Sequence, residues 1–231
     1  MTHSVDNFSA PPLIAIDGLG AVGKTTVGRI VARRLGYRFV DTGEMYRALT
    51  WLALHRGIDT RDEPSLSKLA LEARLVIKTS TGSEHHSVAI DGLDVTDEIY
   101  GHRVEAEVSN VSRIAGVRES LVSRQRTMAQ EGKLVMAGRD IGTVVLPQAN
   151  LKVFLVASPE ERANRRHREK RGLPGVSYEQ MLSELKSRDA IDSTRVLSPT
   201  VPAHDARILD TEGLTPEQVA DKILALAKEI S

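Results

Sequence analysis

The segment GLGAVGKTT at residues 18–26 restricts the possible folds of this chain more than any other stretch. It directly follows the apolar run LIAID at residues 13–17. Apolar residues then recur at helical spacing until Gly36, namely Val27, Ile30, Val31 and Leu35. A buried strand, a glycine-rich turn and an amphipathic helix in this order form the first half of a βα unit. The chain is therefore expected to have an α/β fold.

The same segment matches the phosphate-binding loop pattern Gly18-x4-Gly23-Lys24-Thr25. Glycines allow the backbone N–H groups to turn inward, and the following helix N-terminus favours an anion. Lys24 is expected at the β and γ phosphates, and the Thr25 hydroxyl at a Mg²⁺ ion, with Thr26 as the alternative. A glycine-rich turn that only allows close packing of the helix would not require Lys24 and Thr25. The predicted binding site for a nucleoside triphosphate comprises Gly18, Leu19, Gly20, Ala21, Val22, Gly23, Lys24, Thr25 and Thr26.

Further apolar segments repeat the first strand at residues 37–41, 133–137, 151–157 and 206–210. They lack clean alternation of apolar and polar residues, as expected of parallel strands covered on both faces. Ser158 and Thr215 each begin a capping box with proline at the first helical position, which predicts a helix after each of the last two strands. The sequence therefore predicts a five-stranded parallel sheet with helices between the strands.

Residues 74–95 depart from this pattern. The segments RLVIKTS and HSVAIDG flank the turn-rich TGSEH, which predicts a β-hairpin. The hairpin is too short to fold alone, so we expect it to be an insert in the α/β domain.

The overall composition excludes several classes of protein. The 231 residues are 41% apolar and 27% charged, with 31 basic and 31 acidic side chains, so no global field favours nucleic acid or membranes. The chain has no cysteine, which excludes disulfides and thiolate metal sites. The first residues lack a basic start and an apolar stretch, and no run approaches the roughly 18 apolar residues of a membrane helix. We expect a soluble, cytoplasmic protein with a single domain.

Arginines follow two of the predicted strands, at the sheet edge where ligands bind in open α/β sheets. DTGEMYRA at residues 41–48 brings Arg47, and AGRDIGT at residues 137–143 brings Arg139 and Asp140. The adjacent Arg139 and Asp140 could equally form a structural salt bridge with each other.

A third basic segment lies on a predicted helix. Arg188, Asp192 and Arg195 are spaced so that they share one helical face. Taken alone, this pattern is more typical of a solvated stripe than of a binding site.

The run ERANRRHREKRG at residues 161–172 is dense in arginine. It could be a solvated helix face or a nonspecific polyanion patch. Aromatic residues make up only 3% of the chain, which argues against base stacking on single-stranded nucleic acid. An arginine-rich lid over a triphosphate fits better, with Gly172 and Gly175 as hinges.

Phosphoryl transfer would explain this demand for cations. Donor and acceptor phosphates repel each other, and negative charge spreads over the transferred group. A GTPase would instead require a guanine-recognition motif, and neither N-K-x-D nor D-x-x-G occurs in a convincing position.

Taken together, the motifs of this chain resemble those of the bacterial cytidylate kinase family. They are GLGAVGKTT, DTGEMYR, IDGLDVTDEI after the hairpin, VRESLVSRQR, AGRDIGTVV and SRDAIDSTR. The resemblance runs from about residue 13 to the C-terminal helix. It implies a three-layer P-loop kinase, with an inserted acceptor-binding subdomain at about 70–102 and a lid at about 161–176. It also implies that the γ-phosphoryl group of ATP is transferred to CMP or dCMP with the help of Mg²⁺.

The resemblance also implies roles for individual residues. The catalytic group would comprise Lys24, Arg162, Arg166 and Arg195. The residues at CMP would be Asp41, Arg47, Ser109, Arg118, Arg139, Asp140, Arg188, Asp192 and Arg195. Ser109, Arg118 and Asp140 would recognise cytosine, because a carboxylate complements its amino group and a guanidinium complements its ring acceptors. Glu44 is unusual beside an anion site, and a solvent-facing orientation would account for it.

Two alternatives remain at the level of sequence. One is another small P-loop kinase acting on a different nucleotide or metabolite. The other is a noncatalytic module that binds nucleic acid through the basic run, which the balanced charge and sparse aromatics oppose. The resemblance favours a monomer, and the choice of ATP over GTP stays open.

Overall fold

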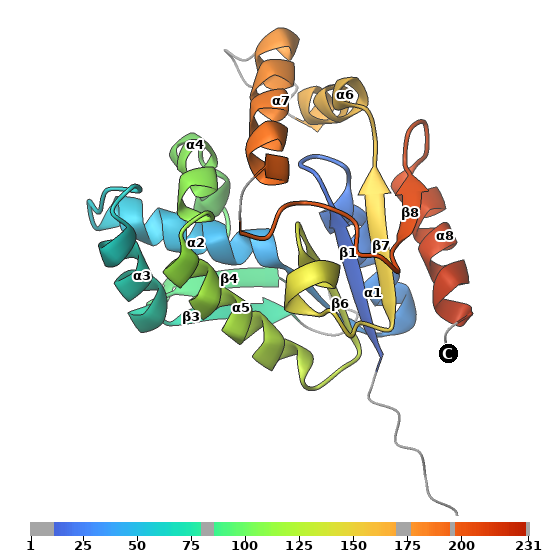
Figure 1. Ribbon diagram of the computed structural model, residues 1–231, viewed down its shortest axis with the longest axis horizontal. Helices are drawn as coiled ribbons and strands as arrows, with labels where there is room; N and C mark the ends of the chain where they lie inside the picture. Colours follow the sequence, from blue (N-terminus) through green and yellow to red (C-terminus); the bar gives the residue numbers. More distant parts are fainter. Residues whose placement is uncertain (1–11, 80–85, 170–176, 195–196, 230–231) are drawn as a thin grey trace, which may run out of the picture.

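The structure is a computed structural model of the 231-residue chain, and it describes residues 12–79, 86–169, 177–194 and 197–229. Two sheets organise these residues (Figure 1), one with five strands and one with three. Every strand pair of the larger sheet is parallel, which confirms the α/β fold expected from the sequence.

The strands of the larger sheet run in the order β2-β6-β1-β7-β8. Their bounds are β1 (Leu13–Gly18), β2 (Arg38–Asp41), β6 (Leu134–Gly138), β7 (Leu151–Val156) and β8 (Arg207–Asp210). These are the five segments predicted from the apolar runs, shifted by a residue at some ends. β1 lies in the centre, so the loop that follows it opens at the middle of the sheet edge.

Helices cover both faces of this sheet and make three layers. On one face, Ile14 and Ile16 of β1 pack with α1 (Lys24–Leu35) and α8 (Pro216–Lys228). On the other face, Ala15 packs with α5 (Ala115–Ala129) and with η2 (Ile141–Val145), a single π-helical turn. Alternate residues of a strand point to opposite faces of the sheet. Because helices cover both faces, almost every residue of the strand has to be apolar.

The predicted hairpin forms as β3 (Leu75–Thr79) and β4 (His86–Ile90), which pair antiparallel. Its predicted turn at residues 81–85 lies outside the described residues. A short third strand, β5 (Leu93–Asp94), adds to β4. The sequence did not predict β5, because two exposed residues carry no apolar pattern.

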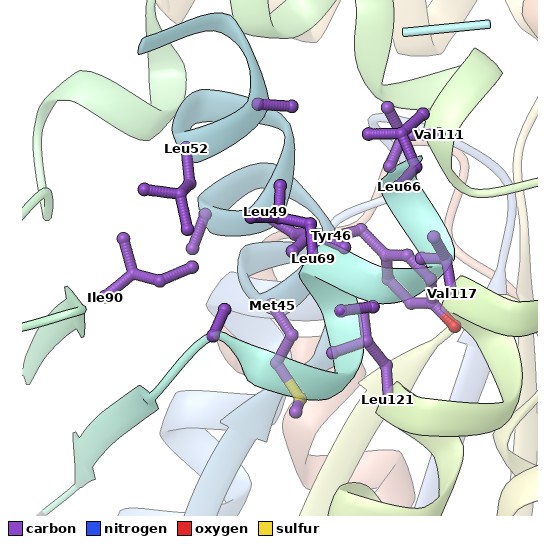
Figure 2. Close-up of a cluster of buried hydrophobic side chains, with 14 of the residues drawn as sticks. Met45, Tyr46, Leu49, Leu52, Leu66, Leu69, Ile90, Val111, Val117 and Leu121 are labelled. Carbon is purple, nitrogen blue, oxygen red and sulfur yellow. The ribbon is translucent and has the colours of Figure 1, made fainter. Parts of the chain in front are cut away.

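The small sheet belongs to a second hydrophobic core. Its β4 packs with α2 (Thr42–His55), α3 (Glu63–Glu72), α4 (His102–Val111) and α5, and the 3₁₀ turn η1 (Glu98–Tyr100) joins them. Figure 2 shows side chains of α2, α3 and α5 in contact at the centre of this cluster. We call this unit the helical subdomain. It spans α2 to α5 and is larger than the hairpin predicted as the insert.

The remaining helices, α6 (Pro159–Glu169) and α7 (Tyr178–Thr194), lie beyond the carboxyl ends of β1 and β7 (Figure 1). The predicted capping box at Thr215 is present at the start of α8. Among the described residues, no helix combines the length and apolar character that crossing a membrane requires.

Candidate active site

The loop after β1 has the backbone of a phosphate-binding loop. Gly18 and Gly23 have φ of 147° and 97°, conformations that side chains disfavour. At Gly18 a Cβ atom would also lie 2.5 Å from the carbonyl oxygen of Leu155, so only glycine fits. Helix α1 begins directly after Gly23, and its first N–H groups therefore face the loop.

Lys24 is the first residue of α1 and lies under this loop. Its side chain is buried, with 8% of the residue exposed, and Nζ donates a hydrogen bond to the carbonyl oxygen of Leu19 at 2.7 Å. Burial lowers the pKa of Lys24, and the nearby Arg139 lowers it further. A cation held in this way lacks a full counter-charge, which a bound anion would supply.

Thr25 and Asp41 connect the loop to the second strand. The Thr25 hydroxyl donates a hydrogen bond to Asp41, whose other oxygen accepts one from the backbone N–H of Gly43 at 2.9 Å. Asp41 thereby caps α2. Thr26 is exposed, whereas the Thr25 hydroxyl contacts Asp41, so Thr25 is the better placed of the two predicted metal ligands.

Asp17 is a functional candidate that sequence reasoning missed. It ends the apolar part of β1 and accepts hydrogen bonds from the backbone N–H groups of Ile141 and Gly142, both at 2.7 Å. Burial raises the pKa of Asp17 to about 6, with a contribution from the charge of Asp140. A carboxylate at the carboxyl end of a central strand was the available signal. Asp17 fixes the turn that carries Arg139 and Asp140.

Arg139 and Asp140 do not pair with each other. Arg139 donates to Asp192 of α7 through Nε at 2.8 Å and lies 3.4 Å from the carbonyl oxygen of Gly18 through Nη1. Asp140 instead accepts a hydrogen bond from Arg118 of α5. The turn therefore directs one residue toward the phosphate-binding loop and the other toward the helical subdomain.

The Arg118–Asp140 pair is almost fully buried. The Arg118 guanidinium also lies 5.8 Å from the Tyr46 ring centre and 3.5 Å from the Ser112 carbonyl oxygen. The Ser112 hydroxyl in turn donates to the carbonyl oxygen of Ser109 at 3.1 Å. The structure thus brings Ser109, Arg118 and Asp140 into one neighbourhood, although they come from three elements.

Glu105 is a second residue that sequence reasoning missed. Its carboxylate contacts one nitrogen each of Arg47 at 2.6 Å, Arg166 at 2.7 Å and Arg188 at 2.7 Å. Burial alone would raise the pKa of Glu105, but these guanidiniums together hold it below its usual value. The only sequence signal was its position four residues before Ser109, on the same face of α4.

Arg188 and Asp192 are not part of a solvated stripe. Asp192 is buried, and burial lowers the pKa of Arg188 to about 10, with a further contribution from Arg139. Arg195, the third residue of that predicted face, lies outside the described residues. Helix α7 therefore directs at least these two side chains into the site.

The arginine run divides between buried and exposed positions. Arg162 is only 2% exposed and donates to both oxygens of Asp189, at 3.1 and 2.6 Å, and to the carbonyl oxygen of Gly20 at 3.1 Å. Arg168 is exposed. A purely solvated helix face is therefore excluded for α6. Residues 170–176, with the proposed glycine hinges, lie outside the described part of the chain.

The expected solvent-facing orientation of Glu44 is wrong. Glu44 is only 1% exposed, and its carboxylate lies 2.8 Å from the Tyr100 hydroxyl, 2.9 Å from Nε2 of His86 and 3.3 Å from Nη2 of Arg29. These partners come from η1, β4 and α1, and only the folded chain brings them together. Glu44 therefore has a structural position beside the site.

Known proteins of similar sequence show the family of this chain. The family model described as cytidylate kinase matches residues 14–229. The cytidylate kinase of Pelotomaculum thermopropionicum is 48% identical over 216 residues, which cover 93% of this chain and 95% of that protein. The cytidylate kinase of Desulforamulus reducens is 49% identical over 212 residues, which cover 91% of this chain and 94% of that protein.

A solved structure supports the fold independently. The shikimate kinase of Bacteroides thetaiotaomicron aligns with a TM-score of 0.51 at 14% identity, covering 94% of this chain and 98% of that one. At this identity the likeness concerns only the P-loop kinase fold. The sequence relationship, in contrast, extends over nearly the whole chain. The chain belongs to the cytidylate kinase family.

Proposed function

We propose that the protein transfers the γ-phosphoryl group of ATP to CMP or dCMP, which yields ADP and CDP or dCDP. Its relatives at 48–49% identity are named cytidylate kinases. The observation that carries the proposal is the buried Arg118–Asp140 pair beside a phosphate-binding loop and several arginines. Other P-loop kinases share the loop, but this pair has the polarity that complements cytosine.

On the donor side, residues 18–26 would bind the triphosphate. The loop N–H groups and Lys24 would hold the β and γ phosphates, and the buried cation at Lys24 supports this role. Mg²⁺ fits the oxygen ligands at Thr25 and Asp41, and it would neutralise charge on the β and γ phosphates when bound. Mg²⁺ usually keeps several waters and phosphate ligands, so few protein ligands are needed.

On the acceptor side, Arg47 and Arg139 would hold the phosphate, together with Arg195. Arg47 and Arg188 meet at Glu105, and Arg139 reaches the backbone of Gly18. Arg188 and Asp192 would lie near the sugar, and Asp41, which accepts a hydrogen bond from Thr25, would also contact CMP. The acceptor phosphate would therefore lie close to the phosphate-binding loop.

Base specificity would come from Asp140, Arg118 and Ser109. Asp140 would accept a hydrogen bond from the amino group of cytosine, while Arg118 donates to its ring acceptors. Uracil presents an oxygen in place of the amino group, so the Asp140 oxygen that faces the base would have no donor. Such a loss costs on the order of 1 to 3 kcal/mol or more, which is roughly a 5-fold to over 100-fold preference for CMP.

The reaction needs positioning and charge neutralisation rather than a general base. A phosphate oxygen of CMP, already ionised at neutral pH, would attack the γ-phosphorus while the bond to the β-phosphate oxygen breaks. Lys24, Arg162, Arg166 and Arg195 would neutralise the charge that spreads over the transferred group. The arginine-rich segment at 161–176 would close over the nucleotides and exclude water, which otherwise competes as nucleophile.

The hairpin region at about 70–102 would support the acceptor site. Three of the proposed acceptor residues lie on helices of the same subdomain, with Arg47 on α2, Ser109 on α4 and Arg118 on α5. We also propose a cytoplasmic monomer that binds neither nucleic acid nor membranes. The equal numbers of basic and acidic side chains and the absence of cysteine support this view.

A coupled assay of ADP release tests the proposal. The wild-type protein would be supplied with ATP and Mg²⁺ and with CMP, dCMP, UMP, AMP or GMP as acceptor. We expect CMP and dCMP to give the highest kcat/KM. A higher value for any other acceptor would show that the cytosine assignment is wrong.

A further inference from the structure

Glu105 lies where four helices of the active site meet. It belongs to α4, and its carboxylate contacts Arg47 of α2, Arg166 of α6 and Arg188 of α7. With 20% of its side chain exposed, it is largely shielded from water. A single carboxylate at the centre of three guanidiniums reduces their mutual repulsion and fixes where each of them lies.

The Glu105 cluster retains capacity for an anion. Three guanidiniums surround one carboxylate, so the group keeps a surplus of positive charge. In the described part of the chain, Nε of Arg188 is buried and has no hydrogen-bond partner. Glu105 contacts Arg188 through Nη1, which leaves Nε of the same guanidinium as a donor for a bound anion. A phosphate can therefore join the cluster without displacing Glu105.

Helix α6 connects this cluster to the phosphate-binding loop. Arg162 contacts the carbonyl oxygen of Gly20, and Nη1 of Arg165 lies 3.3 Å from that of Val22. Arg166 follows Arg162 by four residues, which is roughly 6 Å along the helix and on the same face. Helix α6 thus contacts the phosphate-binding loop through Arg162 and Arg165, and Glu105 through Arg166.

We propose that Glu105 is a positioning residue that couples acceptor binding to donor binding through α6. An acceptor nucleotide that binds Arg47 through its phosphate and Arg188 near its sugar would fix Glu105. Glu105 in turn holds Arg166, and with it the helix that contacts the donor loop. Acceptor binding would then reduce the motion of α6, so that donor binding would cost less conformational entropy. Each nucleotide would therefore increase the affinity of the protein for the other. This inference rests on the proposed function, because it takes CMP as the acceptor.

The test is a measurement of binding coupling. The Kd of a nonhydrolysable ATP analogue with Mg²⁺ is measured by calorimetry alone and in saturating CMP, for the wild-type protein, Glu105→Gln and Glu107→Gln. Glu107 is the matched control, since it lies on the same helix and contacts Thr60 and Asn110 rather than the arginines. We expect CMP to tighten analogue binding by roughly 5-fold or more in the wild type and in Glu107→Gln. In Glu105→Gln the ratio is expected to fall toward one.

Two outcomes would overturn the proposal, namely a wild-type ratio of one and an unchanged ratio in Glu105→Gln. An unchanged ratio with tighter CMP binding would mean that Glu105 only competes with phosphate. If circular dichroism shows that Glu105→Gln does not fold, Glu105→Asp replaces it, because this variant keeps the negative charge on a shorter side chain. The factor by which CMP tightens analogue binding is expected to be smaller in Glu105→Asp than in the wild type. A protein that neither binds nor phosphorylates CMP would instead refute the proposed function, so the two failures are distinguishable.

Discussion

Glu105, Asp140, Asp189 and Asp192 each hold one or more arginines of the active site. Asp140 pairs with Arg118, while the other three bind arginines of the α2, β6, α6 and α7 regions. Arginine side chains lose much rotational freedom when they are fixed. Because the carboxylates fix them in the folded protein, less of that entropy remains to be lost when phosphates bind.

Lys24 provides the first prediction for a single residue. Lys24→Ala is expected to reduce kcat/KM for CMP by roughly 100-fold or more, because a buried cation at the transferred phosphate is lost. Among the described residues, Nζ of Lys24 donates to the carbonyl oxygen of Leu19 and forms no ion pair within 4 Å. Because a buried charge without a close carboxylate is removed, the melting temperature is expected to stay close to that of the wild type. Steady-state kinetics and thermal unfolding measure the two effects. Wild-type turnover in this variant would exclude the loop from the mechanism.

Asp17 provides a prediction about pH. Its folded pKa of about 6 lies above the usual 3.8, so the folded state disfavours the charged form. This group therefore stabilises the protein fully below about pH 4 and loses that contribution as pH rises through 6. The expected loss is up to about 3 kcal/mol.

Asp17→Asn isolates that contribution. The free energy of unfolding is measured with urea between pH 4 and 7 for both proteins. The difference in this free energy between wild type and variant is expected to change between about pH 4 and pH 6. Titrating groups that do not interact with Asp17 are common to both proteins and cancel in the difference, whereas the charges of Asp140 and Lys24 act on Asp17 and are part of the effect. Parallel stability profiles would show that Asp17 does not carry the effect.

At the level of elements, Glu44 joins α2 to three neighbours. Its contacts with Arg29, His86 and Tyr100 connect the first helix of the sheet layer to the helical subdomain. Glu44→Ala is expected to lower the free energy of unfolding by about 2 to 3 kcal/mol, because hydrogen bonds to a buried charge are lost. The measurement is urea denaturation.

Glu72→Gln is the control for this prediction. Glu72 is exposed, and its contact with Lys68 at 3.8 Å is a surface pair between neighbouring helical turns. The control is expected to change stability by less than about 0.5 kcal/mol. Equal effects of the two substitutions would contradict a structural role for Glu44.

The elements also show how far sequence reasoning extends. The parallel strands and the hairpin were predictable. A strand that is buried in the core must consist largely of apolar residues, and such a run is visible within a few consecutive positions of the sequence. Helix α5 was less visible, since it buries Arg118 and Gln125 among its apolar residues. A charged residue can be buried there only because its partner, Asp140, arrives from another element.

The same reason limits prediction of the site. Arg188 and Asp192 were assigned to the site by the family resemblance, since their spacing alone favoured a solvated stripe. The partner of Arg188, Glu105, lies 83 residues away. Likewise, Asp189 pairs with Arg162 at a separation of 27 residues. The family motifs identify the arginines and the lysine that would contact phosphate. Which carboxylates hold these cations depends on how the helices pack, and the sequence does not show this packing. Glu44 was misjudged for this reason as well.

At the level of the whole molecule, the residues proposed to bind the two substrates belong to two different hydrophobic cores. The phosphate-binding loop belongs to the core between the large sheet, α1 and α8, whereas Arg47, Ser109 and Arg118 belong to the helical subdomain. Asp140 comes from the sheet and pairs with Arg118 of the subdomain. The proposed cytosine site therefore lies where the two units meet.

The most direct test of the account compares CMP with UMP in the wild type and in Asp140→Ala. The ratio of kcat/KM for CMP over UMP is measured in both proteins with ATP and Mg²⁺. We expect the wild type to prefer CMP by roughly 5-fold to over 100-fold, and the variant to lose most of this preference because the carboxylate that accepts the amino hydrogen is gone. An unchanged ratio in Asp140→Ala would contradict the account, since some other group would then distinguish the two bases.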